Sequence, residues 1–159
     1  MTKISASVIV RGDAARTRQA LLTHLGSLPK TKGGERLLRL RAMGPKPGVG
    51  KEQSDRSFAW HDAHVTFKNA FDELRLEYRV QVNWVPIGTR ALPSFNGLFH
   101  LQRVKEPGRC RLVIAGEYEP PLSIVGKAFD AIAGKRIAQD TLRRLLGEIR
   151  GAIEAANAD

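Results

Sequence analysis

The sequence predicts an α+β fold in which a curved antiparallel β-sheet of six to seven strands wraps around a long C-terminal helix. Before residue 119, the chain is predicted to form one strand, a short helix and a run of strands, several of which show the alternation of apolar and polar residues typical of half-buried strands. From Ser123 onward, apolar residues recur at helical spacing. The sheet has one apolar face, and the C-terminal stretch is the only large helical element predicted, so the two are expected to cover each other.

Length and composition indicate one domain over 1–159. A chain of 159 residues is large enough to bury a core, and 42% hydrophobic with 26% charged residues is ordinary for a globular protein. The N-terminus lacks the pattern of a signal peptide, and no apolar run approaches the roughly 20 residues of a membrane span. We therefore expect a cytoplasmic protein without a transmembrane segment. Cys110 is the only cysteine, which excludes an intramolecular disulfide and a cysteine-based zinc site.

The net charge of +10 is concentrated in the N-terminal third, where residues 1–56 carry 12 Lys and Arg against 4 Asp and Glu. Such a surface attracts phosphates or anionic lipid, or it is a solvated face that keeps the protein soluble. Its arginines lack interleaved aromatic residues for base stacking, and no helix-turn-helix or zinc-finger pattern occurs. Nucleic acid is therefore a disfavoured partner, peripheral contact with an anionic membrane stays open, and the oligomeric state is not predicted.

The N-terminal elements follow from local signals. Residues 3–10 alternate as a strand, and Asp13 is a good N-cap for an amphipathic helix over 14–25. Leucines among arginines favour an edge strand over 35–42. The Gly- and Pro-rich stretch 44–51 is expected to be a loop.

Five further strands are predicted over 57–62, 63–69, 74–85, 90–104 and 109–118. The first two are the weaker predictions, and 74–85 has the clearest alternation in the chain. The connections between successive strands are short, which favours an antiparallel meander, since parallel pairing needs crossovers of a dozen residues or more.

The order of these elements is similar to the helix-grip fold of the START-like (SRPBCC) superfamily, which includes polyketide cyclases, plant pathogenesis-related allergens and lipid-transfer domains. The local resemblance is Gly116-Glu-Tyr-Glu-Pro-Pro-Leu-Ser-Ile-Val-Gly126, where a last strand passes through a Pro-containing corner into the long helix. The resemblance implies an apolar cavity between sheet and helix that binds or transports a lipid, sterol or polyketide-like molecule. A cyclase- or dehydratase-type enzyme on the same fold is the alternative, so enzymatic activity stays open.

Large side chains on the inferred inner faces are the candidate ligand-binding residues. Plain core packing would explain them equally well, and the tyrosines and the arginine would add polar groups that orient a ligand. The candidates are Tyr78, Trp84, Phe95, Phe99, Arg103, Tyr118, Phe129 and Ile132. Gly97 and Gly116 on the same faces remove side-chain volume and are expected to bend the sheet.

The C-terminal stretch carries two apolar stripes whose directions differ by about 100° at 100° per residue. We expect the helix to be kinked or broken near Gly134, where the phase changes. A segment over 123–133 would lie at the mouth of the cavity and one over 136–156 would grip the sheet. Gly147 and Gly151 fall on the polar face, where helix packing does not explain them.

Other chemistry is disfavoured. A phosphate-binding P-loop would need glycine at Pro45 and a hydroxyl at Glu52. His61 and His64 fall on opposite faces of a strand, whereas metal ligands must converge. Cys110 has the parity of the core residues, where a free cysteine is an inert hydrophobe. The sequence predicts no metal and no cofactor, and it identifies no catalytic residue.

Overall fold

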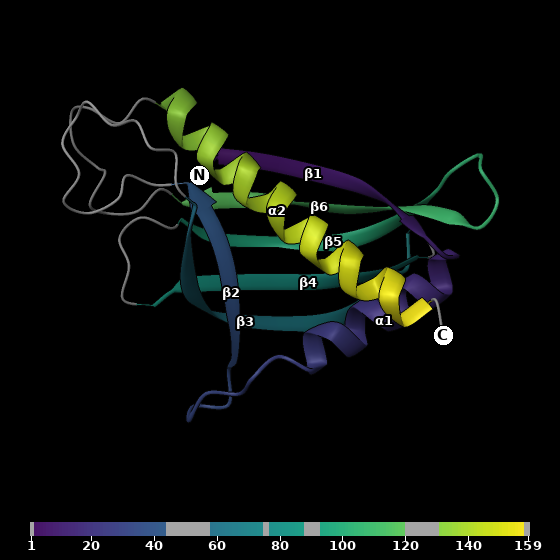
Figure 1. The fold of residues 1–159 in the computed structure, drawn as a ribbon, viewed down its shortest axis with the longest axis horizontal. Helices are drawn as coiled ribbons and strands as arrows, with labels where there is room; N and C mark the ends of the chain where they lie inside the picture. Colours follow the sequence, from purple (N-terminus) through teal and green to yellow (C-terminus); the bar gives the residue numbers. More distant parts are fainter. Residues whose placement is uncertain (1, 44–57, 75–76, 88–92, 120–130, 158–159) are drawn as a thin grey trace.

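The computed structural model describes residues 2–43, 58–74, 77–87, 93–119 and 131–157. These residues form six strands and two helices (Figure 1). In chain order they are β1 (Thr2–Arg11), α1 (Ala14–Gly26), β2 (Arg36–Met43), β3 (Phe58–Asp72), β4 (Glu77–Pro86), β5 (Ser94–Arg103), β6 (Arg109–Glu119) and α2 (Ala131–Asn157).

The six strands form one sheet in the order β1-β6-β5-β4-β3-β2, with every neighbouring pair antiparallel. Strands β2 to β6 are a meander, and β1 pairs with the last strand, so β1 and β2 are the two edges. Helix α2 crosses the sheet and packs against both edge strands (Figure 1). This arrangement confirms the predicted class, a curled antiparallel sheet that grips a C-terminal helix.

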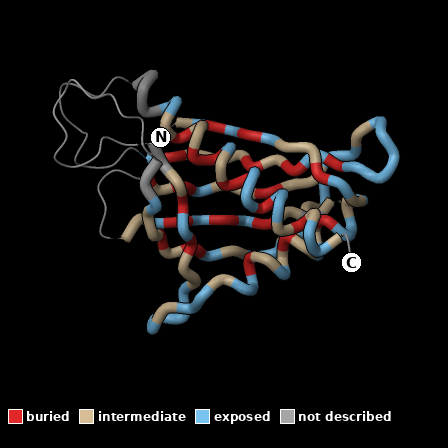
Figure 2. The backbone as a smooth tube through the Cα atoms, in the orientation of Figure 1, coloured by how far each residue is buried: buried red, intermediate tan, exposed pale blue. Residues whose placement is uncertain are grey.

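The core lies between the concave face of the sheet and one stripe of α2 (Figure 2). On β1 the alternation is visible directly, because Ile4, Ala6 and Val10 are buried while Lys3, Ser5 and Ser7 are exposed. The buried residues of α2 recur at helical spacing: Ala138, Leu142, Leu145, Leu146, Ile149 and Ile153. Burial of apolar surface, at about 25 cal/mol per Å², therefore joins the helix to the sheet.

Helix α1 closes one end of this core. The Asp13 side chain accepts a hydrogen bond from the Arg16 backbone N–H at 2.8 Å, which confirms the predicted N-cap. Leu21 and Leu25 are buried, and α1 packs against α2. The predicted boundaries of 14–25 agree with the helix to within one residue.

The free edge of β1 is covered by polar side chains of α2. Gln139 donates from its Nε2 to the Ser5 carbonyl, and Asn157 donates from its Nδ2 to the Arg11 carbonyl at 3.0 Å. The Arg11 backbone N–H donates to Glu154 at 3.1 Å. These bonds satisfy backbone groups that an edge strand otherwise leaves open for pairing with another chain.

Two predicted strand boundaries are wrong. The two strands predicted over 57–62 and 63–69 are a single strand, β3. His61, Ala63 and Val65 alternate onto the concave face without interruption, so there is no turn at Asp62. Leu74, the first residue of the strand predicted over 74–85, lies in the turn before β4 with a fractional exposure of 97%. This leucine therefore belongs neither to a strand nor to the core.

Helix α2 passes through Gly134 without a break. A single glycine costs a helix about 1 kcal/mol relative to alanine but keeps its backbone hydrogen bond, so it does not end the helix. The predicted mouth segment over 123–133 lies, up to residue 130, outside the described residues. A Cβ added at Gly147 or at Gly151 would have no heavy atom within 4 Å, and nothing in the structure explains these two glycines.

Candidate ligand-binding site on the concave face

Three aromatic side chains lie side by side on neighbouring strands of the concave face. The register places Trp84 on β4 opposite Phe95 on β5, and Phe95 opposite Tyr118 on β6. We call these three residues the aromatic row. Each is at most 3% exposed. The Trp84 and Phe95 rings stack with centroids 4.5 Å apart and an interplanar angle of 24°.

The indole of Trp84 is fixed in place by a hydrogen bond as well as by packing. Its Nε1 donates to the Pro93 carbonyl oxygen at 3.2 Å, which satisfies the one polar atom of a buried ring. Pro93 directly precedes β5, so this bond ties the start of β5 to β4. The ring is therefore held rigidly within the apolar core.

A pair of glycines lies beside the aromatic row. Gly97 on β5 pairs with Gly116 on β6, and a Cβ at Gly116 would lie 2.3 Å from the Asn96 carbonyl oxygen and 2.5 Å from the Gly97 Cα. Only glycine allows the two strands to come this close. A Cβ at Gly97 would lie 2.6 Å from Phe95 Cζ, so the Phe95 ring occupies the space that this glycine leaves.

His61, considered above only as a possible metal ligand, is a polar group on the same concave face. It pairs with Leu40, which is 1% exposed, and it has the parity of the buried Ala63 and Val65. Its Nε2 is buried and has no hydrogen-bond partner among the described residues. Burying a polar atom without a hydrogen-bond partner lowers stability by about 1–3 kcal/mol. A polar ligand group that hydrogen-bonds to this nitrogen would offset that cost.

Arg36 is a second inward polar residue that the sequence analysis passed over. Its guanidinium lies over the Phe67 ring, 5.9 Å from the centroid, and donates to the Leu28 carbonyl at 2.9 Å. Its parity with Leu38 and Leu40 was the signal available in the sequence. Arg36 joins β2 to the segment after α1 and is occupied by these contacts.

The predicted site residues divide into three groups. Trp84, Phe95, Phe99 and Tyr118 are brought together on the concave face, with Phe99 1% exposed between Val80 and Ile114. Arg103 has the expected parity, since it pairs with Cys110, but it is exposed at the end of β5. The side chains of Tyr78 on β4 and Ile132 on α2 are not described, and Phe129 lies outside the described residues.

The thiol of Cys110 is buried in the core, with 1% exposure. Burial raises the pKa of this thiol, which disfavours the thiolate that acts as nucleophile. His61 and His64 lie on opposite faces of β3, and His64 Nδ1 is 3.2 Å from Glu35 Oε2. Within the described ranges, no three His, Cys, Asp or Glu side chains form a group that could hold a metal ion.

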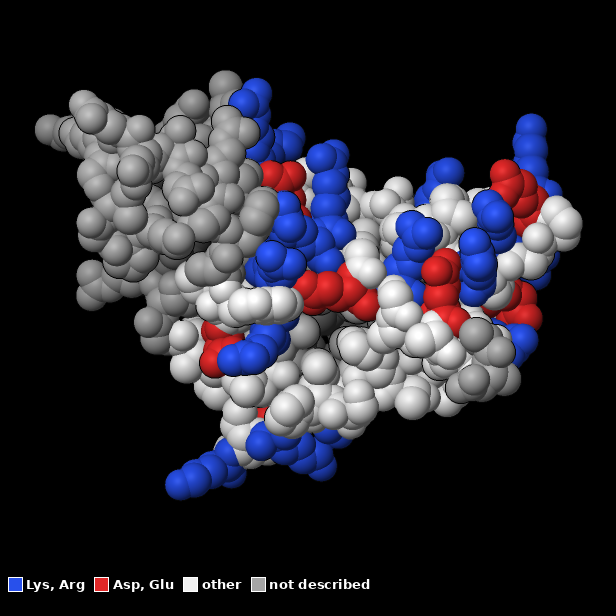
Figure 3. Space-filling view, viewed as in Figure 1, with Lys and Arg blue, Asp and Glu red and all other residues white. Residues whose placement is uncertain are grey.

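Charge on the face seen in Figure 3 is mixed. Over the described part of that face, blue Lys and Arg atoms are interspersed with red Asp and Glu atoms. On β2, Arg39 pairs with Asp62 at 3.3 Å, and the Arg41 guanidinium lies over the Trp60 ring, 5.2 Å from its centroid. The basic excess of the N-terminal third is therefore partly compensated in the folded chain. Neither described helix is both long enough and apolar enough to cross a membrane.

Together, the sheet order and the helix across its concave face define the class of fold, which is the helix-grip fold. Two solved structures share it. The protein TTHA0849 from Thermus thermophilus is 14% identical, with a TM-score of 0.51 over 98% of this chain and 99% of its own. XoxI from Bacillus cereus is 11% identical, with a TM-score of 0.51 over 100% of this chain and 97% of its own.

A START superfamily protein from Mycobacterium smegmatis is 13% identical, with a TM-score of 0.48 over 97% of this chain and 98% of its own. No protein-family model and no curated protein matches the sequence. At identities this low, a structural likeness shows the fold alone. The function must therefore be argued from the side chains of this chain.

Proposed function

We propose that this protein binds a hydrophobic small molecule, such as a lipid, sterol or polyketide-like compound, between the concave face of the sheet and α2. The observation that carries the proposal concerns His61, which lies on the same face as the aromatic row. Its buried Nε2 has no hydrogen-bond partner among the described residues. Binding sites for small molecules combine apolar walls with a few placed polar groups, and this face has both.

The apolar part of the site would be the aromatic row together with Phe99. Stacked and hydrogen-bonded rings lose little conformational freedom when a ligand binds, so more of the burial energy of about 25 cal/mol per Å² is realised as affinity. His61 would then orient the ligand by a hydrogen bond to a hydroxyl, carbonyl or carboxyl group. Its neutral ring both donates and accepts, which suits any of these groups.

The two tryptophans provide a direct test, because they lie on opposite faces of the sheet. Trp60→Phe leaves Trp84 as the reporter on the concave face, and Trp84→Phe leaves Trp60, which is 52% exposed on the outer face. Each variant is titrated with oleic acid, cholesterol and emodin while tryptophan emission is recorded. We expect a saturable change in Trp84 emission with at least one probe and none in Trp60 emission.

His61→Leu separates a binding role from a structural one. Loss of a net hydrogen bond of about 1 kcal/mol should weaken binding of that probe by roughly five- to tenfold. Stability should not fall, because the substitution removes a polar atom that has no partner among the described residues. Unchanged affinity in His61→Leu, or no saturable Trp84 response to any of the three probes, would contradict the proposal.

Salt separates this function from binding to an anionic membrane or to nucleic acid through the basic surface. Apolar burial is not Coulombic, so raising salt from about 50 to 200 mM should leave the affinity nearly unchanged, whereas contacts with phosphates weaken steeply. A steep loss of affinity over that range would point to the basic surface instead.

A further inference from the structure

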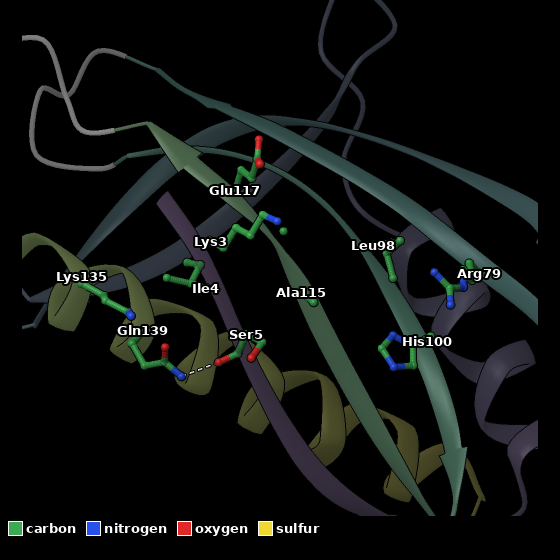
Figure 4. A pocket seen from close by; sticks show the side chains of 11 residues that line it. Lys3, Ile4, Ser5, Arg79, Leu98, His100, Ala115, Glu117, Lys135 and Gln139 are labelled. Carbon is green, nitrogen blue, oxygen red and sulfur yellow. Dashed lines mark hydrogen bonds between the residues drawn. The ribbon is translucent and has the colours of Figure 1, made fainter. Parts of the chain in front are cut away.

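The outer face of the sheet carries a hollow beside the edge strand β1 (Figure 4). It has a volume of about 680 Å³ and runs from the first half of α2 across β1, β6, β5 and β4. We call it the outer groove. It is lined by Lys3, Ile4, Ser5, Arg79, Leu98, His100, Ala115, Gly116, Glu117, Lys135 and Gln139.

The cross-strand register explains why the surface is hollow here. Ser5 on β1 pairs with Ala115 on β6, and Ala115 pairs with Leu98 on β5, which makes a row of short side chains next to one leucine. The next row is longer, with Lys3 opposite Glu117. Ala115 and Leu98 therefore form an apolar floor, and longer polar side chains form the rim.

The charges of the rim are not balanced along its length. Arg79, at the β4 end, is held by Glu77 at 2.9 Å and by Asp72 at 3.5 Å. At the α2 end, neither Lys3 nor Lys135 has a carboxylate within ion-pair distance among the described residues. The lysines reach the groove from two different elements, β1 and α2, as Figure 4 shows.

We propose that the outer groove binds an amphipathic anion, a small molecule with a phosphate or carboxylate group on an apolar body. The anionic group lies between Lys3 and Lys135, and the apolar body covers Leu98 and Ala115. The volume falls within the range of small-molecule sites, and an apolar floor with a few charged groups is their usual composition. Because strand side chains alternate between faces, most of this site lies on the opposite side of the sheet from the aromatic row, and only Ile4 and Gly116 of its lining belong to the concave face.

Methyl NMR tests the site, because each methyl group lies on one face of the sheet and its chemical shift therefore shows on which face the probe binds. Octyl phosphate is the probe, and octyl glucoside is the uncharged control with the same alkyl chain. We expect octyl phosphate to shift the methyl signals of Leu98 and Ala115 saturably while those of Ile114 and Val82, on the concave face, move little. Inorganic phosphate alone should bind more weakly, because it leaves the apolar floor uncovered.

The double variant Lys3→Gln with Lys135→Gln should weaken binding of octyl phosphate by roughly tenfold or more, since two half-solvated charges each contribute a few-fold. Lys105→Gln, in the exposed β5–β6 turn, is the control for a change in net charge and should have little effect. Three results would overturn the proposal: no saturable shift of Leu98 and Ala115, equal binding of octyl glucoside, or unchanged affinity in the double variant. Shifts confined to the Ile114 and Val82 methyls would assign the probe to the concave site instead and would also overturn it.

Discussion

The two faces of β5 and β6 differ completely although their residues alternate along the same strands. On the concave face, Phe99 and Ile114 are at most 1% exposed and belong to the core cluster that also contains the buried residues of α2. On the outer face, their chain neighbours Leu98 and Ala115 are half-buried at the floor of a polar groove. The comparison shows that one sheet can support two chemically different surfaces, each of which can be altered separately.

The largest expected difference between the faces is in stability. Ile114→Ala removes a side chain that is 0% exposed and should lower the free energy of unfolding by about 2–5 kcal/mol. Val113→Ala, one residue away on the outer face, should cost less, at about 1 kcal/mol, because its side chain is only half-buried. Urea denaturation measures both, and equal losses would show that the faces are not distinct.

Gly116 should be the most sensitive glycine tested, because its strand approaches β5 too closely for a Cβ. Gly116→Ala places a carbon 2.3 Å from the Asn96 carbonyl oxygen, so we expect a loss of about 1–3 kcal/mol in the free energy of unfolding. Gly147→Ala is the matched control in open space on α2 and should raise stability by up to about 1 kcal/mol. A neutral Gly116→Ala would mean that β5 and β6 separate at little cost.

The smallest effect concerns His24, half-buried where α1 meets α2. Burial lowers the pKa of His24 from its ordinary value of 6.5, so the unfolded chain binds a proton more tightly than the native protein does. The free energy of unfolding should therefore fall as the pH drops below about 6.5 and level off below the native pKa. His24→Gln should lose that part of the pH dependence in urea denaturation between about pH 7.5 and 5, and an unchanged pH dependence would show that His24 does not contribute.

Most of the fold could be predicted from the sequence because its signals are local. Alternation identified the concave face of β1, β5 and β6, and Asp13 identified the start of α1. The predicted strand ends were wrong where the alternation of apolar and polar residues was the only signal for a turn. The predicted strand over 57–62 ends at Asp62 although the alternation continues through it, and the predicted strand over 74–85 begins at Leu74, which lies in a turn.

The candidate sites were less predictable, because they depend on which residues the register brings together. Trp84, Phe95, Phe99 and Tyr118 were identified by size and parity. The role proposed for His61 rests on its buried Nε2, which has no partner among the described residues and which no sequence pattern encodes. The outer groove joins Lys3 to Lys135, residues far apart in the chain that only the packing of α2 beside β1 brings to one rim.

The central claim, that a hydrophobic molecule binds on the concave face, is tested most directly by nuclear Overhauser contacts between protein and ligand. The measurement uses methyl-labelled protein and whichever of oleic acid, cholesterol and emodin changes Trp84 emission. We predict contacts from the bound probe to the Ile114 and Val82 methyl groups and to the Trp84 ring, and none to Leu98 or Ala115. Contacts to Leu98 and Ala115 alone, or a probe that reaches no methyl group of the concave face, would contradict the account.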